Sequence, residues 1–580
     1  MPRIAVVDER LCFPLKCNIE CVRGCPINRV GKDCLYLYDR KKAKAKGHDG
    51  AIEQAPVHVT KREYSREERE NGLAEVDPEL CTGCGICPKV CPFHALTIIN
   101  LAEAKPEDLV YSYGYNSFGL YRLALPKKGL TAIVGENGCG KTTNVRLLAG
   151  LLEPQRTPTK EIEEFFRGGR GSFVVKPQEL AAPKESKSVG ELLEGVDESG
   201  RLADLVKLFD LEKLLQRSLG QLSGGELQRV VVAAALARDK ENYFLDEPFS
   251  FLDYVYRIRL TEFLKEHFSE KRVLLVDHDL SLLSYVCMQS YILYGRESAY
   301  GIVSQVYSTD RAVNMFLEGF IGPENVRFRD EAISYRQYPE SEHKREAYSI
   351  GAMEASKGAF VVRNPSQISL LEGEVVGIAG PNGIGKSALC ESVFLHSSGR
   401  AAFKPQLLDR SHQLVGESLS ASGIFPENAL KTMDLRRLEF LRQSDLSGGQ
   451  LQRLKVFECL NQEKSLYILD EPTNMLDASA RITLSKVVRE RAQGLSAVLV
   501  VDHDLEFLYN TVDRVVVMEG VPAVEGRVAG IFDKDEGIRM LMRQFDLSYR
   551  RDGESRRLKL NKKGSKKDAE LKGSGKYIER

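Results

Sequence analysis

Short apolar segments that run into glycine-rich or acidic motifs occur twice along the chain, in the same order. Residues 130–134 lead into GENGCGKT, and Val375–Ala379 leads into GPNGIGKS. Further along, residues 242–248 (NYFLDEP) and 465–472 (SLYILDEP) end in paired carboxylates. Short apolar runs of this kind are typical of strands buried on both faces of a sheet. The repeat therefore predicts two α/β domains of one design.

Nothing in the hydrophobic pattern indicates a membrane or secreted protein. The longest fully apolar run, residues 230–237, is far shorter than the roughly 20 residues that span a bilayer. The first residues, MPRIAVVDERLC, lack the apolar core and cleavage site of a secretory signal. We therefore expect a cytoplasmic protein with no membrane contact.

Length and composition indicate a folded protein of several domains. At roughly 100–200 residues per domain, 580 residues argue for three to five domains. Contents of 43% hydrophobic and 28% charged residues exclude wholesale disorder. Basic and acidic residues balance at 82 each, but residues 550–580 hold twelve basic against five acidic ones. Such a tail is usually a solvated, flexible end, although it could also follow a phosphate backbone.

Eight of the thirteen cysteines lie in two clusters near the N-terminus. The second cluster, CTGCGICPKVCP, has the C-x2-C-x2-C-x3-C-P spacing that folds around a [4Fe-4S] cube while its last cysteine reaches a second cube. The first, CFPLKCNIECVRGCP, is looser but ends in the same Cys-Pro. By this ferredoxin logic, one set of ligands is Cys81, Cys84, Cys87 and Cys25, and the other is Cys12, Cys17, Cys21 and Cys91.

Zinc and disulfides are the alternatives for these cysteines. Structural zinc sites usually pair two C-x2-C knuckles across a long gap, and a reducing cytosol disfavours disulfides. Two iron–sulfur clusters in a ferredoxin-like domain are therefore expected. Between the halves, residues 32–75 are polar and contain RKKAKAK, which indicates a surface insertion. Its basic run could touch nucleic acid, although a solvated loop is favoured.

The two glycine-rich motifs have the P-loop pattern. Their glycines let backbone N–H groups turn inward around a β-phosphate, while Lys141 or Lys386 reaches the β- and γ-phosphate oxygens. Thr142 and Ser387 are placed to ligate Mg²⁺. This motif alone would suit any nucleotide hydrolase of the P-loop class.

The paired carboxylates supply the rest of a phosphoryl-transfer site. Asp246 and Asp470 should serve Mg²⁺, and Glu247 and Glu471 should polarise the attacking water. Just before them, LSGGELQR (222–229) and LSGGQLQR (446–453) each place a Ser-Gly-Gly turn at the start of a helix. Such a helix terminus is a second anion-binding element.

With this motif in place, both halves resemble ATP-binding-cassette domains. The resemblance implies that the signature of each cassette completes the ATP site of the other, in a head-to-tail pair. It also implies Q-loop, switch and D-loop residues, which are Gln178 and Gln406, His278 and His503, and Asp253 and Asp477. The switch histidines each end an apolar strand at a similar distance after the acidic pair.

The chain contains no tryptophan, so stacking on adenine must come from other rings. Tyr113 and Phe118 precede the first P-loop at a distance suitable for stacking on adenine. Phe360 takes this place before the second P-loop, but Lys357 stands where the first cassette has Tyr113, so stacking on adenine should be weaker there. The remaining predicted nucleotide contacts are Gly135, Asn137, Gly138, Gly140, Thr143, Ser223, Gly224, Gly225 and Glu226, and Gly380, Asn382, Gly383, Gly385, Ser447, Gly448, Gly449 and Gln450. The Mg²⁺ set is Thr142, Gln178 and Asp246 in one cassette, and Ser387, Gln406 and Asp470 in the other.

Two ferredoxin-like clusters ahead of twin cassettes resemble the class E ATP-binding-cassette family, also called RNase L inhibitors. SAYGIVS (298–304) and GPENVRFRD (322–330) are similar to that family's first hinge, and residues 549–577 to its basic second hinge. The expected fold is a multidomain α/β chain. Its parts are a ferredoxin-like domain (1–105), a first cassette (106–295), hinge 1 (296–345), a second cassette (346–540), and hinge 2 with the tail (541–580).

Three features depart from the family pattern. The helix-loop-helix insertion of the first cassette is shortened to one helix before Gln178. The switch segments have the sequence VDHD instead of VEHD. The polar insertion between the cysteine clusters is long, whereas the second cassette is trimmed by about 17 residues after its P-loop helix, counted from Lys386 to Gln406. These departures indicate a divergent member.

The resemblance implies an ATPase that splits ribosomes, or post-termination complexes, after a release or rescue factor has acted. Its partners would be the small ribosomal subunit with its RNA and such a factor, and the chain would act as a monomer with its cassettes paired internally. One alternative is a small-subunit-bound anti-association or initiation-assisting factor. Another is an ATP-dependent redox enzyme, which no electron-acceptor motif supports. A transporter subunit is the least favoured class, because both cassettes occur without a spanning helix.

Overall fold

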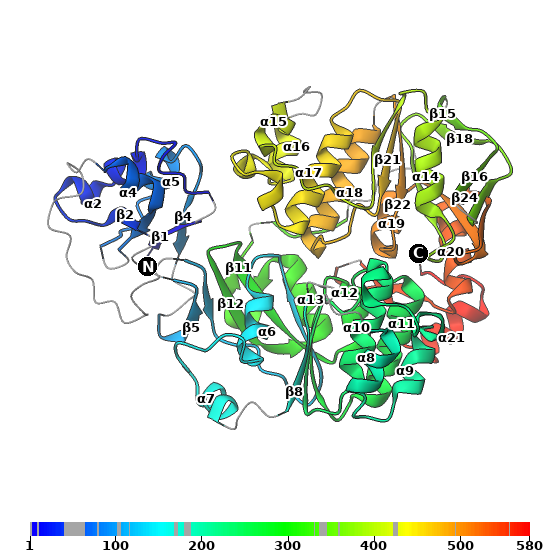
Figure 1. Cartoon of the computed structure of the whole chain (residues 1–580), viewed down its shortest axis with the longest axis horizontal. Helices are drawn as coiled ribbons and strands as arrows, with labels where there is room; N and C mark the ends of the chain where they lie inside the picture. The colour runs from blue at the N-terminus through cyan, green and yellow to red at the C-terminus, as the bar shows by residue number, and fades with distance from the viewer. Residues whose placement is uncertain are drawn as a thin grey trace.

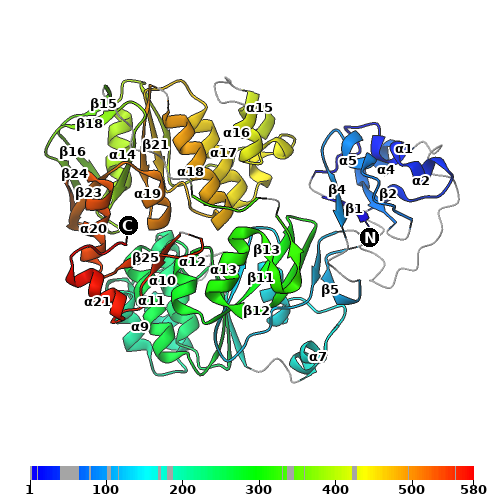
Figure 2. The same cartoon turned by 180° about the vertical axis from the view of Figure 1, so that it is seen from behind.

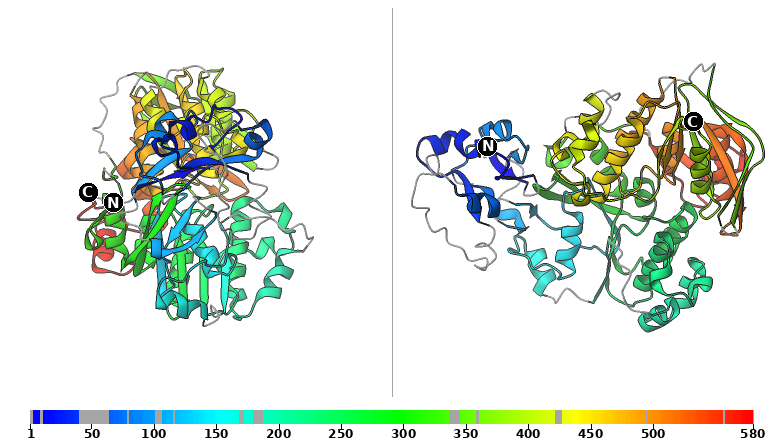
Figure 3. Two further views of the ribbon diagram at one scale, coloured as in Figure 1. Left: turned by 90° about the vertical axis from the view of Figure 1, so that its left-hand side faces the viewer. Right: turned by 45° about the horizontal axis from the view of Figure 1, so that its top comes forward.

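The structure is a computed structural model that describes residues 3–8, 11–39, 64–77, 80–100, 106–114, 117–167, 172–178, 187–329, 331–335, 345–357, 360–420, 427–493, 495–555 and 557–579. A small N-terminal domain lies beside two larger α/β domains, which are stacked on one another (Figure 1). Seen end-on, the N-terminal domain lies across the seam between the two (Figure 3). The three parts match the expected order of a ferredoxin-like domain and two cassettes.

The N-terminal domain contains two small antiparallel sheets. Strand β1 (Arg3–Val7) pairs with β4 (Leu96–Asn100), and β2 (Leu35–Asp39) pairs with β3 (Gly72–Val76). Its helices are α1 (Glu20–Gly24), α2 (Pro26–Arg29), α4 (Arg66–Asn71) and α5 (Ile86–Val90). The expected insertion at 32–75 is therefore narrower than its polar composition indicated, since both of its ends form strands of the domain. Residues 40–63, which include its basic run, lie outside the described residues.

Both cassettes contain an eight-stranded sheet with one strand order. The orders β5-β6-β12-β11-β7-β10-β9-β8 and β16-β17-β24-β23-β19-β22-β21-β20 correspond strand by strand. The first sheet consists of β5 (Leu109–Ser112), β6 (Gly119–Tyr121), β7 (Gly129–Gly135), β8 (Phe173–Lys176), β9 (Asn242–Asp246), β10 (Arg272–Val276), β11 (Gln289–Arg296) and β12 (Tyr300–Ser308). The second consists of β16 (Met353–Lys357), β17 (Phe360–Asn364), β19 (Val375–Ala379), β20 (Ala401–Lys404), β21 (Leu466–Asp470), β22 (Ala497–Val501), β23 (Arg514–Val521) and β24 (Glu525–Asp533). The apolar segments seen in the sequence are the buried parallel strands of these sheets, as predicted.

Helices follow the strands in both cassettes. The first has α6 (Lys141–Leu148), α7 (Lys160–Arg167), α8 (Val189–Val196), α9 (Leu202–Leu208), α10 (Gly224–Leu236), α11 (Tyr254–His267), α12 (Leu280–Val286) and α13 (Thr309–Glu318). The second has α14 (Lys386–Leu395), α15 (Val415–Ser420), α16 (Glu427–Thr432), α17 (Gly448–Leu460), α18 (Ala478–Ala492), α19 (Leu505–Thr511) and α20 (Lys534–Gln544). Between α6 and β8 the described residues contain only α7, and α14 is followed directly by β20, so both expected shortenings are present. In the described ranges no helix combines the length and apolar character needed to cross a bilayer.

Short elements complete the chain. Additional strands are β13 (Phe320–Ile321), β14 (Val326–Arg327), β15 (Glu346–Ile350), β18 (Ile368–Leu371), β25 (Tyr549–Arg551) and β26 (Leu558–Leu560), and the last helix is α21 (Lys566–Gly573). Single 3₁₀ turns lie at Pro106–Asp108, Glu212–Leu214, Leu219–Gln221, Gly322–Glu324, Arg436–Leu438 and Gln443–Asp445.

Two expected domain boundaries need correction. Residues 296–308 were assigned to hinge 1, but β11 and β12 form an antiparallel hairpin inside the first sheet, so the cassette continues through β12. The segment SAYGIVS is the turn and second strand of this hairpin. The boundary at 540 likewise cuts through α20. The first error arises because hinge resemblance in sequence does not reveal strand pairing, and the second because it does not reveal where a helix ends.

The basic C-terminal segment is folded, contrary to the expectation of a flexible end. Figure 2 shows it running along the helices of the first cassette. Leu558 and Leu560 are buried, and the carbonyl of Leu558 accepts a hydrogen bond from Ser281 Oγ at 2.6 Å. Arg557 is 4% exposed and donates to Ser284 Oγ at 2.7 Å. Buried leucines and hydrogen bonds, including one from a buried arginine, therefore hold this segment in place together.

Candidate ATP sites and iron–sulfur centre

The two P-loops have the same local geometry, each set between a buried strand and a helix. Lys141 Nζ donates to the carbonyls of Gly135 and Glu136 at 2.8 and 2.7 Å. Lys386 Nζ makes the matching bonds to Gly380 and Pro381 at 2.9 and 2.7 Å. The loops thus wrap around their lysines, which places each ammonium at the start of α6 or α14, where phosphate binds.

The predicted aromatic platforms lie at the edges of these loops. A Cβ at Gly140 would lie 2.6 Å from the Phe118 ring, and one at Gly385 would lie 2.6 Å from the Phe360 ring, so both rings pack directly on P-loop glycines. Tyr113 is more accessible, at 47% exposed, and its hydroxyl lies 3.2 Å from Thr143 Oγ1. Stacking of these rings on adenine stays a prediction.

Glu247 is held in place by side chains from three other motifs. Gln178 Nε2 donates to Glu247 Oε1 at 2.7 Å, and His278 Nε2 lies 3.3 Å from the same oxygen. Thr142 Oγ1 in turn donates to Gln178 Oε1 at 3.2 Å. Although burial opposes ionisation, the hydrogen bond and charge of His278, with Lys141, lower the pKa of Glu247 to about 2. The P-loop, Q-loop, acidic pair and switch thus converge as the sequence predicted.

The second cassette repeats this arrangement around Glu471. His503 Nε2 lies 3.4 Å from Glu471 Oε1. Burial again opposes ionisation, but His503 and a hydrogen bond with Gln406 lower the pKa of Glu471 to about 2. Both glutamates have a left-handed backbone, with φ of 50° and 46°. Such conformations are costly for non-glycine residues and occur where the fold must aim a functional side chain.

Asp246 and Asp470 have the surroundings expected of Mg²⁺ ligands. Burial is the largest cause that raises the pKa of each to about 6, although hydrogen bonds with Thr142 and Ser387 oppose it. Asp246 Oδ2 and Asp470 Oδ1 are buried and have no hydrogen-bond partner within the described part of the chain. A cation beside these oxygens would satisfy them and favour the ionised carboxylate, so the residues fit the ion.

Sequence reasoning missed two pairs of supporting residues. Lys176 is 1% exposed and donates to the carbonyls of Asp246 and Glu247 at 2.8 and 2.9 Å. Lys404 makes the same bonds in the second cassette, and burial lowers the pKa of both lysines to about 8. Gln228 and Gln452, one turn into the signature helices, donate to the carbonyls of Glu247 and Glu471. The available signal for the lysines was the repeated triplet KPQ, which ends in the glutamine of each Q-loop.

The cassettes face each other head to tail. The backbone N–H of Asn137 in the first P-loop donates to Asp477 Oδ2 in the second D-loop at 2.8 Å. The N–H of Asn382 donates to Asp253 Oδ2 at 3.4 Å. In addition, a Cβ at Gly449 of the second signature would lie 3.5 Å from Asn137 Nδ2. The first P-loop therefore faces the D-loop and signature of the second cassette.

Both signature turns cap helices. Ser223 and Ser447 are the N-cap residues of α10 and α17, and each forms a reciprocal capping box, with Glu226 and Gln450 respectively. In each box the Ser side chain accepts from the N–H of the third helical residue, and the other N–H groups of a helix's first turn have no partner within the helix.

The cysteines of each predicted set lie near one another, and their role as cluster ligands stays a prediction. Burial is the main cause that raises the pKa of Cys21, and the neighbouring thiols of Cys91, Cys12 and Cys17 add to it. Cys87 likewise has Cys81, Cys84 and Cys25 around it, and burial with these thiols raises its pKa to about 12. Among the described residues, no three such side chains converge on a point that would bind a single metal ion. Groups of four cysteines with this spacing are typical of [4Fe-4S] ligand sets.

One further thiol at this centre was not predicted. Cys34 is 2% exposed and forms hydrogen bonds with both Cys25 and Cys81. Its hydrogen bond is the largest cause that lowers the pKa of each of these two thiols to about 6, which favours the thiolates that iron binds.

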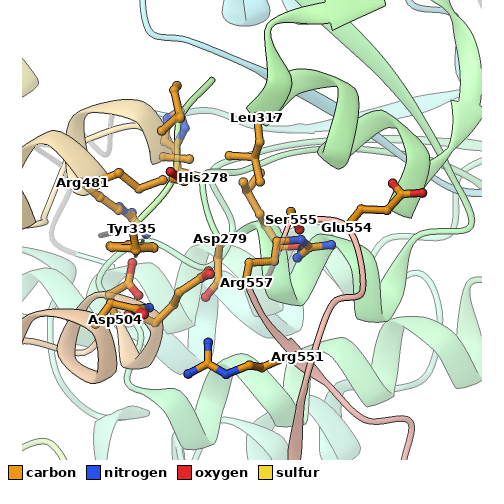
Figure 4. A pocket seen from close by; sticks show the side chains of 17 residues that line it. His278, Asp279, Leu317, Tyr335, Arg481, Asp504, Arg551, Glu554, Ser555 and Arg557 are labelled. Atoms are coloured by element: carbon orange, nitrogen blue, oxygen red, sulfur yellow. Dashed lines mark hydrogen bonds and ion pairs between the residues drawn. The ribbon is translucent and has the colours of Figure 1, made fainter. Parts of the chain in front are cut away.

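A cavity of about 680 Å³ lies where both cassettes and both hinges meet (Figure 4). Its labelled lining includes charged residues of opposite sign from both cassettes, as well as hinge residues, among them His278, Asp279, Tyr335, Arg481, Asp504 and Arg557. Each cassette supplies an ion pair to this region, Arg481 with Asp504 at 2.8 Å and Arg257 with Asp279 at 3.4 Å.

Comparison with known proteins agrees with this geometry. A model of ABC transporter domains matches residues 121–250 and 364–474, and a 4Fe-4S dicluster model matches residues 11–95. The ABC transporter E family member 1 of Arabidopsis thaliana is 32% identical, covering 100% of this chain and 98% of that protein.

Two solved structures are also similar along most of their length. One, described as ribosome-bound archaeal Pelota and ABCE1, has 34% identity and a TM-score of 0.87, and covers 100% of this chain and 99% of its own. The other, the complex of an archaeal ribosomal stalk protein with an archaeal ribosome recycling factor, has 34% identity and a TM-score of 0.74, and covers 82% of this chain and 100% of its own. With the iron–sulfur domain, paired ATP-hydrolysing cassettes and matching lengths all present, the chain belongs to the class E ATP-binding-cassette (RNase L inhibitor) family.

Proposed function

We propose that this protein splits ribosomes, or post-termination complexes, into subunits by ATP-driven closure of its cassettes. The observation that carries this proposal is the position of the iron–sulfur domain, which touches both cassettes. Val6 forms a buried contact with Ala299 of the first cassette. On the other side, the ring of Phe93 packs edge-on against Phe440 of the second cassette, with centroids 4.6 Å apart. Rotation of one cassette against the other would therefore displace this domain.

The chemistry that powers closure is assigned to this chain's own side chains. Lys141 and Lys386 bind the β- and γ-phosphates, and Glu247 and Glu471 accept a hydrogen bond from the attacking water. Their low pKa keeps both carboxylates ionised at neutral pH. Asp246 and Asp470, with Thr142 and Ser387, would hold Mg²⁺, which neutralises charge on the phosphates.

Two [4Fe-4S] clusters are proposed as the structural core of the N-terminal domain. The two sets of four thiols described above would hold them. In a domain this small, cluster binding replaces much of the free energy that a hydrophobic core would supply. The domain then acts as a rigid contact surface.

The proposed partners are the ribosome, chiefly its small subunit and RNA, and a release or rescue factor. Support comes from the relatives, since one solved structure is described as ribosome-bound with Pelota and another as a ribosome recycling factor. We propose that the chain works in the cytoplasm as a monomer whose cassettes pair internally.

A hydrolysis-deficient variant tests the proposal. Glu247→Gln with Glu471→Gln retains the phosphate contacts, so it should bind ATP, close, and accumulate on small subunits. Sedimentation of ribosomes with ATP should show subunits split by the wild type and the variant retained on the small subunit. A variant that stays ribosome-free with ATP present would refute the proposal. Binding to free small subunits without splitting would indicate the anti-association role instead.

A further inference from the structure

Glu297, in the turn between β11 and β12, lies directly against the first P-loop. A Cβ at Gly138 would be 2.3 Å from Glu297 Cγ and 3.2 Å from its Cα, so this glycine leaves the space that Glu297 fills. Gly138 has a φ of +75°, which also favours glycine. The turn therefore covers the edge of the phosphate cradle that contains Lys141.

The same side chain reaches across to the second cassette. Gln450 of the second signature donates from Nε2 to Glu297 Oε1 at 2.9 Å. Glu297 also forms an ion pair with Arg437, which has a second carboxylate partner in Asp434 at 2.6 Å. Glu297 and Arg437 are only 21% and 24% exposed, so solvent screens this pair less than a surface pair.

Arg437 connects this contact to the iron–sulfur domain as well. Burial disfavours its charge, but Glu297, Asp434 and also Asp8 of the N-terminal domain together raise its pKa. Two residues after Glu297, Ala299 forms the buried contact with Val6. The turn thus lies where the first P-loop, the second signature and the iron–sulfur domain meet.

Among the residues that the structure describes, no equivalent connection is seen at the other composite site. The equivalent turn of the second cassette, between β23 and β24, carries Pro522 and Ala523, neither of which is charged. The first signature's Glu226 has its ion pair with Arg217 inside its own cassette. The hydrogen bond from P-loop to D-loop is also shorter at the first site, with 2.8 Å for Asn137 against 3.4 Å for Asn382 at the second.

We propose that Glu297 is a positioning residue that holds the second signature against the first P-loop, so that the site of Lys141 and Ser447 retains ATP longer than the site of Lys386 and Ser223. The inference rests on the composite ATP sites and deepens the proposed closure. It does not depend on the ribosomal task, because its test uses the isolated protein.

Release of labelled ATP from each site of the full-length protein tests the inference. Lys386→Ala disables ATP binding at the second site, so that release is measured from the first site alone. Lys141→Ala does the reverse, and release is then measured from the second site. Glu297→Gln should speed release about tenfold in the first background, the scale expected for one hydrogen bond to a charged group, and leave the second unchanged. Equal acceleration in both backgrounds, or none in the first, would overturn the proposal.

A double-mutant cycle separates the ion pair from a general loss of packing. If the pair acts as a unit, Glu297→Gln with Arg437→Gln should release ATP no faster than either single variant. Fully additive acceleration would overturn the assignment. Glu525→Gln, in the equivalent hairpin, is the matched control: Glu525 is 55% exposed and pairs with Arg363 of its own cassette, so release from both sites should be unchanged.

Discussion

Asn137 and Asp477 are 340 residues apart in the chain, yet the backbone N–H of one donates to the carboxylate of the other at 2.8 Å. The second oxygen of Asp477 accepts a bond from Ala480 and so caps α18. One carboxylate therefore joins the first P-loop to a helix of the second cassette. Any movement that separates the cassettes must break this bond.

This double role yields the first prediction. Asp477→Asn can still cap α18 with its one amide oxygen, but the NH2 group that replaces Oδ2 cannot accept the bond from the N–H of Asn137. ATP turnover should therefore fall with little change in melting temperature. Asp477→Ala should also lose about 1 kcal/mol of stability with the cap. Turnover in the Lys386→Ala and Lys141→Ala backgrounds assigns the loss, which we expect at the site of Lys141. A loss confined to the site of Lys386 would contradict the head-to-tail pairing.

The second prediction concerns Lys404, one of the two buried lysines behind the acidic pairs. Lys404→Met should remove the lysine donor from the carbonyl of Asp470, which costs about 1–3 kcal/mol, whereas the carbonyl of Glu471 keeps its bond from Gln452. Hydrolysis should slow at the site of Lys386 while ATP binding is retained, because the P-loop is unchanged. The control is Lys464→Met, whose ammonium donates to the carbonyl of Gly399 at an exposed position. Binding by calorimetry and turnover by phosphate release measure the two effects.

A third prediction concerns the iron–sulfur centre. Cys84→Ser or Cys25→Ser should lose about four of about eight irons and unfold the N-terminal domain, while ATPase activity largely survives. Cys34→Ser should keep its iron, since Cys34 is a hydrogen-bond partner of the predicted ligands. Iron content and absorbance near ~400 nm measure the outcome. Normal iron in Cys84→Ser, or zinc in place of iron in the wild type, would refute the ligand assignment.

The fourth prediction is a pH dependence at the cavity between cassettes and hinges. Burial is the main cause that raises the pKa of Glu506 to about 8, although Arg557 opposes it. In the unfolded chain this carboxyl titrates near ~4.5, so between the two values the folded state binds the extra proton. Stability should therefore fall as the pH rises from about 5 through 8. Glu506→Gln, which cannot ionise, should flatten this part of a melting-temperature profile from pH 6 to 9; an unchanged slope would show that Glu506 does not cause it.

Much of this architecture could be predicted because its chemistry lies in contiguous motifs. The P-loops, acidic pairs, signatures and cysteine runs each bring several functional groups together within a few residues. What could not be predicted depends on burial or on distant partners. Lysine is usually an exposed residue, so although the repeated KPQ triplet marks Lys176, its 1% exposure could not be expected from residue type.

Glu297 was missed for a related reason. It precedes the segment that resembles a hinge, and its role is visible only once Arg437 and Gln450, more than a hundred residues away in sequence, lie beside it. The C-terminal segment was misjudged from its net charge, although Leu558 and Leu560 between the charges supply the apolar contacts that fix it.

The iron–sulfur domain contacts both cassettes, through Val6 on Ala299 of the first and through Phe93 on Phe440 of the second. Because these contacts lie on different cassettes, moving the cassettes apart would weaken at least one of them. The edge-on ring contact is worth only about 0.5–1.5 kcal/mol beyond its buried area, less than a single ATP-dependent closure has to supply. On the proposed mechanism, closure could therefore break this contact at modest cost, and the domain would follow the cassette whose contact persists.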